Sequence, residues 1–124
     1  MEGMGQMTAE GQVVVLDLAE RLAAGGKGAI LGLETEDLDI NLVRLNAGSG
    51  VDRHTNREVD VLMVVVDGEG IIEANRTEYP VKTGQAIMIP KGTERAVRNR
   101  SDAAFAYLSL HRRRRKLWPT VPQR

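Results

Sequence analysis

The chain has 124 residues, of which 42% are hydrophobic and 27% charged, and its formal net charge is zero. This length fits a single domain that can bury a core. The sequence contains no cysteine, which excludes a disulfide framework, a zinc–thiolate site and a thiol nucleophile. Aromatic residues make up only 3%, so stacking on bases or sugars is not expected to be the main activity.

The sequence gives no sign of a membrane or export signal. No apolar run approaches the ~20 residues needed to span a bilayer, and the first residues are neither basic nor apolar enough for a signal peptide. Residues 1–6 look like an unstructured leader before Met7. We therefore expect a cytoplasmic protein without membrane contact.

The N-terminal segment, residues 1–28, is expected to hold one strand and one short helix. The β-branched run 13–16 predicts the strand. Asp17 can cap a helix that starts at Leu18, and Leu18 and Leu22 lie one turn apart on one face. The pair Gly25 and Gly26 ends the helix. We expect this segment to pack on the rest of the domain.

From residue 29 to residue 111 the sequence predicts short strands separated by turns. The expected strands are 29–33, 39–45, 51–56, 59–66, 71–75, 77–81, 86–89, 95–98 and 103–111. Many short strands with glycine-rich turns and one early helix indicate an all-β sandwich or barrel. Residues 61–66 are all apolar, so that strand needs cover on both faces. One cover is the interior; a second subunit would supply the other, which predicts a homodimer.

The segment 84–99 carries a recognisable spacing. Gly84, Pro90, Gly92, Arg95 and Asn99 are separated by five, one, two and three residues. This spacing resembles the second signature motif of the cupin family, except that Arg95 stands where the family usually has a metal-binding histidine. The glycines and the proline also have structural explanations as turn residues and as the end of a strand ladder.

An upstream segment resembles the first cupin motif more loosely. Gly48 is followed after five residues by His54, which fits the first histidine, and the second histidine falls on Asn56. Counting forward from Asn56 places the motif glutamate at Asp60, whereas counting back from the next motif glycine places it at Val61. The resemblance covers residues 29–111 and implies a small jelly-roll β-barrel with a degenerate metal site.

The resemblance implies up to four metal ligands, of which only His54 is unchanged. His54, Asp60 and His111 could together hold one divalent ion such as Mn, Fe, Ni or Zn. Alternatively, His54 is a hydrogen-bonded histidine at the lip of a pocket, His111 lies at the surface and no cofactor is bound. Asn56 is a poor metal ligand and is expected to hydrogen-bond a bound molecule or the barrel wall.

Arg95 is the most consequential departure from the family pattern. A guanidinium has five donors and no lone pair, so it cannot bind a metal. Two interpretations are open. Arg95 pairs with Asp60 or Glu58, which would lie on one face of the same strand, and closes the former metal site. Or it anchors a carboxylate or phosphate. The cost of an unpaired buried charge favours the first.

The charges separate along the chain. Residues 1–111 hold 11 basic and 17 acidic residues, whereas residues 112–124 hold six basic residues and no acidic one. A basic tail can bind nucleic acid or an acidic partner. The chain has no helix-turn-helix pattern or interleaved aromatics, which argues against nucleic acid. We expect the tail to pair with acids of its own body or of a neighbouring subunit, and Trp118 to pin it in a groove.

Three functions follow from these observations. We favour a non-catalytic or unassigned cupin with a degenerate metal site, which binds a small anionic molecule through His54, Asn56, Asp60 and Arg95. The first alternative is a metal-dependent cupin enzyme of the dioxygenase or isomerase type, using His54 with oxygen ligands. The second is an interaction module that acts through the basic tail.

Overall fold

The computed structural model describes residues 5–114 of the chain. That part contains one helix, α1 (Leu18–Ala23), between the first two strands, and the following strands: β1 (Gly5–Thr8), β2 (Gly28–Glu34), β3 (Leu38–Leu45), β4 (Gly50–Thr55), β5 (Val61–Asp67), β6 (Glu69–Ala74), β7 (Thr77–Lys82), β8 (Ala86–Ile89), β9 (Glu94–Arg98) and β10 (Phe105–Arg112).

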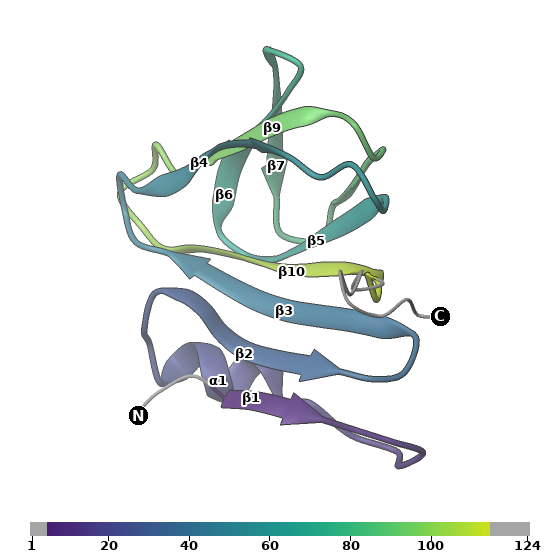
Figure 1. Ribbon diagram of the computed structural model, residues 1–124. Coiled ribbons are helices and arrows are strands. Elements are labelled where there is room, and N and C mark those ends of the chain that lie inside the picture. Colours follow the sequence, from purple (N-terminus) through teal and green to yellow (C-terminus); the bar gives the residue numbers. More distant parts are fainter. Residues whose placement is uncertain (1–4, 115–124) are drawn as a thin grey trace.

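The strands form two sheets. A six-stranded sheet has the order β1-β2-β3-β10-β5-β8, and a four-stranded sheet has the order β4-β9-β6-β7. The four-stranded sheet closes over β10 and β5 to make a barrel, and β3, β2 and β1 extend the larger sheet away from it (Figure 1). The predicted all-β jelly-roll is confirmed, and each strand predicted between residues 29 and 111 is present with its ends shifted by no more than two residues.

The core lies between the two sheets and is built mainly from β-branched and aliphatic side chains, as the scarcity of aromatics requires. Phe105 is the largest fully buried side chain, and it packs against Tyr107 with the ring centroids 5.6 Å apart. Gly70 is needed opposite Phe105, because a Cβ at this position would overlap the phenyl ring. The absence of a side chain at Gly70 thus lets β6 pack directly against the ring of Phe105.

The cupin-motif residue Asn99 has a structural role. Its side chain is buried, and Nδ2 donates to the carbonyl oxygens of Leu45, Asn46 and Ala103 at 2.8–3.1 Å. Its Oδ1 accepts from Ser101. Asn99 therefore joins the end of β3 to the loop that leads into β10, and this satisfies backbone groups that the loop would otherwise bury without partners.

The N-terminal segment differs in part from the prediction. The helix is confirmed: Asp17 Oδ1 accepts from the backbone N of Glu20 at 2.9 Å. Residues 13–16, however, are in no strand; β1 occupies the edge beside β2 instead and pairs with it in parallel. Since β1 starts at Gly5, the expected leader does not extend to residues 5 and 6. Within residues 5–114 no helix is long and apolar enough to cross a bilayer.

Candidate ligand-binding site at the barrel mouth

One end of the barrel, here called the mouth, gathers most of the residues that the sequence singled out. It is formed by the loop 56–60 between β4 and β5, the turn before β9 and the end of β10. The backbone N of Gly92 donates to Asn56 O at 2.7 Å, and Arg112 Nη2 donates to Glu58 O at 3.2 Å. These bonds hold the three segments together around the open end of the barrel.

Arg95 points from β9 into the space between the sheets. Its register partner Ala74 packs on the core, and Val97, two residues along the same face, is buried there. Arg95 also interacts electrostatically with Tyr107, which lies on the opposite sheet. Burial lowers the pKa of the Arg95 guanidinium, attraction to Tyr107 opposes this, and repulsion by Arg114 adds to it. The barrel mouth therefore carries positive charge in surroundings that are partly shielded from water.

No carboxylate among residues 5–114 forms an ion pair with Arg95. The expected pairing with Asp60 or Glu58 is absent there: Asp60 Oδ1 accepts from the backbone N of Lys91 at 2.9 Å, and both acids are exposed. The reason is that residues 56–60 form a loop and not a strand, so the two carboxylates do not share an inward face. The groups that shift the pKa of Arg95 through their charge are the buried phenol of Tyr107 and a second arginine, Arg114.

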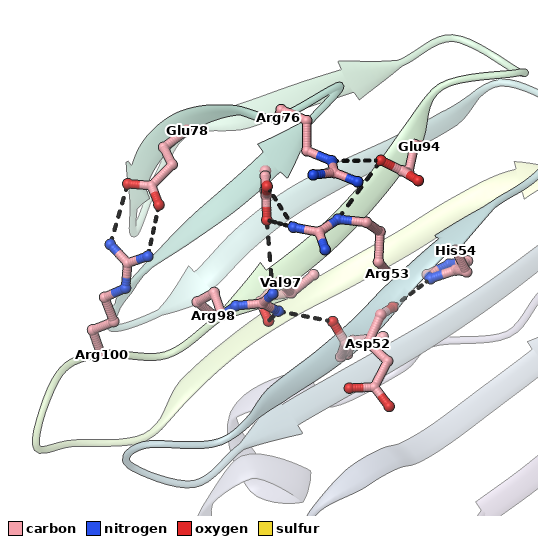
Figure 2. Close-up of polar contacts among 11 residues, drawn as sticks. Asp52, Arg53, His54, Arg76, Glu78, Glu94, Val97, Arg98 and Arg100 are labelled. Atoms are coloured by element: carbon pink, nitrogen blue, oxygen red, sulfur yellow. Dashed lines mark hydrogen bonds and ion pairs between the residues drawn. The ribbon is translucent and has the colours of Figure 1, made fainter.

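On the outward face of the four-stranded sheet, in contrast, arginines are paired with glutamates. Arg53 Nη2 lies 2.7 Å from Glu73 Oε2, and Arg98 Nη2 lies 3.7 Å from Glu73 Oε1. Arg76 Nε lies 2.9 Å from Glu94 Oε1, and the Arg100–Glu78 pair closes at 2.6 Å. Figure 2 shows these pairs side by side on the sheet. Glu73, Glu78 and Glu94 are thus already paired with arginines on the outward face.

Asn56 and His54 add polar groups to the mouth. Asn56 Oδ1 accepts from the backbone N of Glu58 at 3.0 Å and of Val59 at 3.3 Å, while its Nδ2 is buried without a hydrogen-bond partner. His54 is exposed, and its Nδ1 lies 2.9 Å from Asp52 O. Since a carbonyl oxygen only accepts, Nδ1 carries the proton and Nε2 of the neutral ring is left as an acceptor. His54 is directly opposite Arg95 in the β4–β9 register.

Tyr107 belongs to the site and was missed from the sequence. It is buried on β10, and burial raises the pKa of its phenol to about 12, although Arg95 acts in the opposite direction. Alternation along the last strand was the available signal, because it places Tyr107 on the same face as Phe105 and His111. That signal could not show that Arg95 of the other sheet lies near it.

The position of the motif glutamate is settled by the start of β5. Val61 is the first residue of that strand, is 1% exposed and packs in the core, so it occupies the inward position. Asp60 lies outside it in the loop. The backward count from the glycine therefore falls on the inward position, where this chain has a valine and not an acid.

His111 is buried and not at the surface as expected. Its Nδ1 donates to Arg112 O at 2.8 Å, and its Nε2 lies 3.9 Å from Asp39 Oδ2. Within residues 5–114 the structure brings no three His, Asp or Glu side chains together as a group that could hold a metal ion. His54, Asp60 and His111 do not converge, because each is held by a different neighbour. The described residues therefore do not fit the metal that the fold family implies.

The described part of the basic tail contacts the body of the domain. Arg113 Nε lies 3.5 Å from Glu34 Oε2, and the backbone N of Arg113 donates to Asp37 O at 2.7 Å. This agrees with the expected pairing of the tail with acids of its own body. Trp118 and the rest of residues 115–124 lie outside the described residues.

Comparison with known proteins identifies the family. The model of the cupin domain matches residues 41–111, which is more than half of the chain. The chain therefore belongs to the cupin family. No curated protein matches the sequence.

Similar solved structures agree on the fold. TT1209 from Thermus thermophilus is 21% identical with a TM-score of 0.71, over 82% of this chain and 98% of that one. BH2720 from Bacillus halodurans is 18% identical with a TM-score of 0.69, over 86% of each chain. A predicted oxalate decarboxylase from Thermotoga maritima is 19% identical with a TM-score of 0.59, over 63% of this chain and 67% of that one.

At these identities the similarity establishes the fold alone. The chain also spans only 61% of the length of another similar structure, plu4264 from Photorhabdus luminescens. Function has to be argued from the residues at the mouth.

Proposed function

We propose that this cupin binds a small anionic molecule, a carboxylate or a phosphate, at the barrel mouth, with Arg95 as the anchor. The observation that carries the proposal is the placement of Arg95. Its guanidinium points between the sheets, and no acid of residues 5–114 pairs with it. A partly buried charge without a counter-charge is costly to the folded state, and a ligand that supplies the negative charge would offset that cost.

The neighbours of Arg95 favour an anion over other ligands. Arg114 adds a second positive charge close enough to depress the pKa of Arg95. The buried Nδ2 of Asn56 is a donor in need of an acceptor. Guanidinium and amide donors suit the oxygens of a carboxylate or phosphate, and such charge-assisted hydrogen bonds strengthen where water is excluded.

The geometry also suggests how the ligand would be oriented. A carboxylate or phosphate group would take the paired donors of Arg95, which bind such groups bidentately. His54, opposite Arg95 in the register, would accept a hydrogen bond at Nε2 from a hydroxyl of the same molecule. This arrangement binds and selects; it supplies no nucleophile. It therefore favours a binding protein over an enzyme.

The proposal is tested by thermal stabilisation with a panel of small anions. Phosphate, acetate, malate and citrate are compared with glycerol and acetamide as uncharged controls. Binding adds about 2.7 kcal/mol at a ligand concentration 100 times the Kd, which raises Tm by several degrees. Arg95→Gln should abolish the shift. Arg98→Gln is the matched control, because Arg98 lies on the same strand but faces outward to Glu73.

A second measurement separates a binding role from a structural one. Since Arg95 carries an uncompensated charge, we expect Arg95→Met to leave the ligand-free protein as stable as the wild type or more stable. A loss of several kcal/mol together with no anion response in the wild type would contradict the proposal, and Arg95 would then be part of the scaffold.

The metal-enzyme alternative stays a prediction with its own test. It requires about one equivalent of Mn, Fe, Ni or Zn per chain in tag-free protein and loss of that metal in His54→Ala. Nothing in the placement of His54, Asp60 and His111 favours it over anion binding.

The tail hypothesis requires salt-sensitive binding of an acidic partner that is lost on truncation after His111.

A further inference from the structure

The barrel mouth carries positive charge beyond that of Arg95. Two charged side chains of its three segments pair with residues elsewhere: Glu94 with Arg76, and Arg113 with Glu34. A ligand that balances the charge left at the mouth needs more than one negative charge. The charges that remain in these segments are those of five basic and two acidic side chains, namely Arg57, Lys91, Arg95, Arg112 and Arg114 against Glu58 and Asp60.

Arg114 is the basic residue whose charge reaches Arg95. It follows the end of β10, which is held at the mouth because Arg112 Nη2 donates to Glu58 O at 3.2 Å. Burial is the main cause that lowers the pKa of the Arg95 guanidinium, and the positive charge of Arg114 lowers it further, while Tyr107 acts in the opposite direction. Two guanidinium groups therefore lie close enough to repel each other at the same opening.

The neighbouring arginine in the sequence, Arg113, is placed differently. Its Nε lies 3.5 Å from Glu34 Oε2, and its Nη1 donates to Thr35 O at 3.3 Å. Its charge is thus compensated at the end of β2. Arg114 is exposed, and no carboxylate among residues 5–114 forms an ion pair with it.

The polar groups at the opening suit a dianion better than a monoanion. Each guanidinium offers five donors and no acceptor, and the buried Nδ2 of Asn56 is a further donor without a partner. A carboxylate brings one charge and two oxygens. A phosphate monoester carries close to two charges at neutral pH and three strong acceptor oxygens, so one phosphate group can accept from two arginines and balance both charges.

We propose that the site selects a phosphate monoester, whose dianionic phosphate group is held between the guanidinium groups of Arg95 and Arg114. This inference rests on the proposed anion site and narrows its ligands from small anions in general to phosphorylated small molecules. His54, opposite Arg95 in the register, faces the organic part of the ligand. A carboxylate binds at the same place more weakly, because it leaves one of the two positive charges uncompensated.

The first test compares two probes of the same shape and different charge. Methyl phosphate is close to a dianion at about pH 7.5, whereas methyl sulfate has the same tetrahedral head group with one charge. Calorimetric titrations of the full-length protein are made in about 0.1 M salt, where charges more than ~10 Å away are largely screened. The Kd of methyl phosphate should be at least about tenfold lower than that of methyl sulfate or acetate.

The pH dependence of this preference is a second test. The second pKa of a phosphate monoester is about 6, so at about pH 5 methyl phosphate carries little more than one charge, and its Kd should come within about threefold of that of methyl sulfate. Methyl sulfate keeps its charge over this range, so the ratio of the two affinities cancels changes in the protein itself. The charged or titratable groups around the site, which act on both probes alike, are His54, Glu58, Asp60, Lys91, Tyr107 and Arg112.

Two adjacent arginines supply the variants. Arg114→Gln should raise the Kd of methyl phosphate at least about tenfold and change the Kd of acetate no more than about threefold, because Arg95 still binds a single charge. Arg113→Gln is the matched control: it removes the same charge one residue earlier, but its guanidinium is bound to Glu34. It should leave the preference for methyl phosphate unchanged.

The outcomes separate this inference from the anion site itself. If no probe binds in a manner that is lost in Arg95→Gln, the anion site is wrong and the inference fails with it. If acetate or methyl sulfate binds through Arg95 as tightly as methyl phosphate, the anion site stands and the selection of a phosphate monoester is overturned. Equal weakening of methyl phosphate by Arg114→Gln and Arg113→Gln, or a preference that is the same at both pH values, would also overturn it.

Discussion

The two faces of the four-stranded sheet differ in whether their arginines are paired with acids. On the outward face, Glu73 forms ion pairs with two arginines, Glu94 with two, and Glu78 with one. On the inward face, Arg95 has no acid among residues 5–114 and sits beside the buried Tyr107. Arg95, whose charge is disfavoured by burial, is therefore left without a counter-ion in the described part of the chain.

The difference indicates which charges serve the fold and which serve a ligand. Exposed ion pairs contribute little to stability and are common on protein surfaces. A partly buried and unpaired charge weakens the fold, and such groups concentrate at functional sites. The same comparison explains why the outward face, with more arginines, is the weaker candidate for an anion site: its positive charge is already neutralised.

Substituting Gly70 is expected to have the largest effect on stability, because Gly70 packs against the buried ring of Phe105 in the core between the two sheets. In Gly70→Ala the new Cβ overlaps the ring of Phe105, which is fully buried and cannot turn away. We expect a loss of about 3 kcal/mol in the free energy of unfolding by urea. In a Phe105→Leu background the same substitution should cost clearly less. Additive losses in this double-mutant cycle would contradict the contact.

The second prediction concerns the buried phenol on the inward side. The folded-state pKa of Tyr107 is about 12, above the ordinary value of 10, so the folded protein holds this proton more tightly than the unfolded chain. The associated stability is complete below pH 10 and is lost as the pH rises from 10 to 12. The loss reaches about 2 kcal/mol at pH 12, and Tyr107→Phe should remove this part of the pH dependence of unfolding.

The same phenol can report on Arg95. In a Tyr79→Phe background, absorbance at 295 nm follows the ionisation of Tyr107 alone, since the chain has two tyrosines. Because Arg95 lowers the pKa of Tyr107, Arg95→Gln should move the titration to higher pH. A titration that does not move would show that the two groups do not interact across the barrel.

Local sequence information was enough for most of the fold. Apolar segments and turn residues mark each strand between residues 29 and 111, and glycines such as Gly68 and Gly92 have the positive φ that their turns require. The error at residues 13–16 has a non-local cause. A valine run favours a strand only where an edge is available, and the edge of β2 is taken by Gly5–Thr8.

The site was predictable only in outline. Spacing placed His54, Asn56 and Arg95 at one end of the barrel, but it could not decide between Asp60 and Val61, because one residue of register reverses the face of a strand. It also missed Tyr107 and placed His111 at the surface. The role of Tyr107 and the burial of His111 depend on which strand lies across the barrel from them. Residues that are adjacent in the sequence carry no information about this arrangement.

The smallest effect is expected on the outward face, and it compares a partly buried acid with an exposed one. Glu73 is 13% exposed and bonded to Arg53. Glu73→Gln should cost about 1 kcal/mol, because it leaves a guanidinium with a weaker acceptor. In contrast, Glu78 is exposed, and the hydrogen bond from Arg100 lowers its pKa, while desolvation acts in the opposite direction. Glu78→Gln should leave the urea midpoint unchanged, since exposed pairs are screened by salt and solvent. If Glu78→Gln were as destabilising as Glu73→Gln, the outward pairs would form one cooperative network. The ion pairs of the outward face would then stabilise the fold. They could no longer be used as pairs without effect on stability for comparison with the unpaired Arg95.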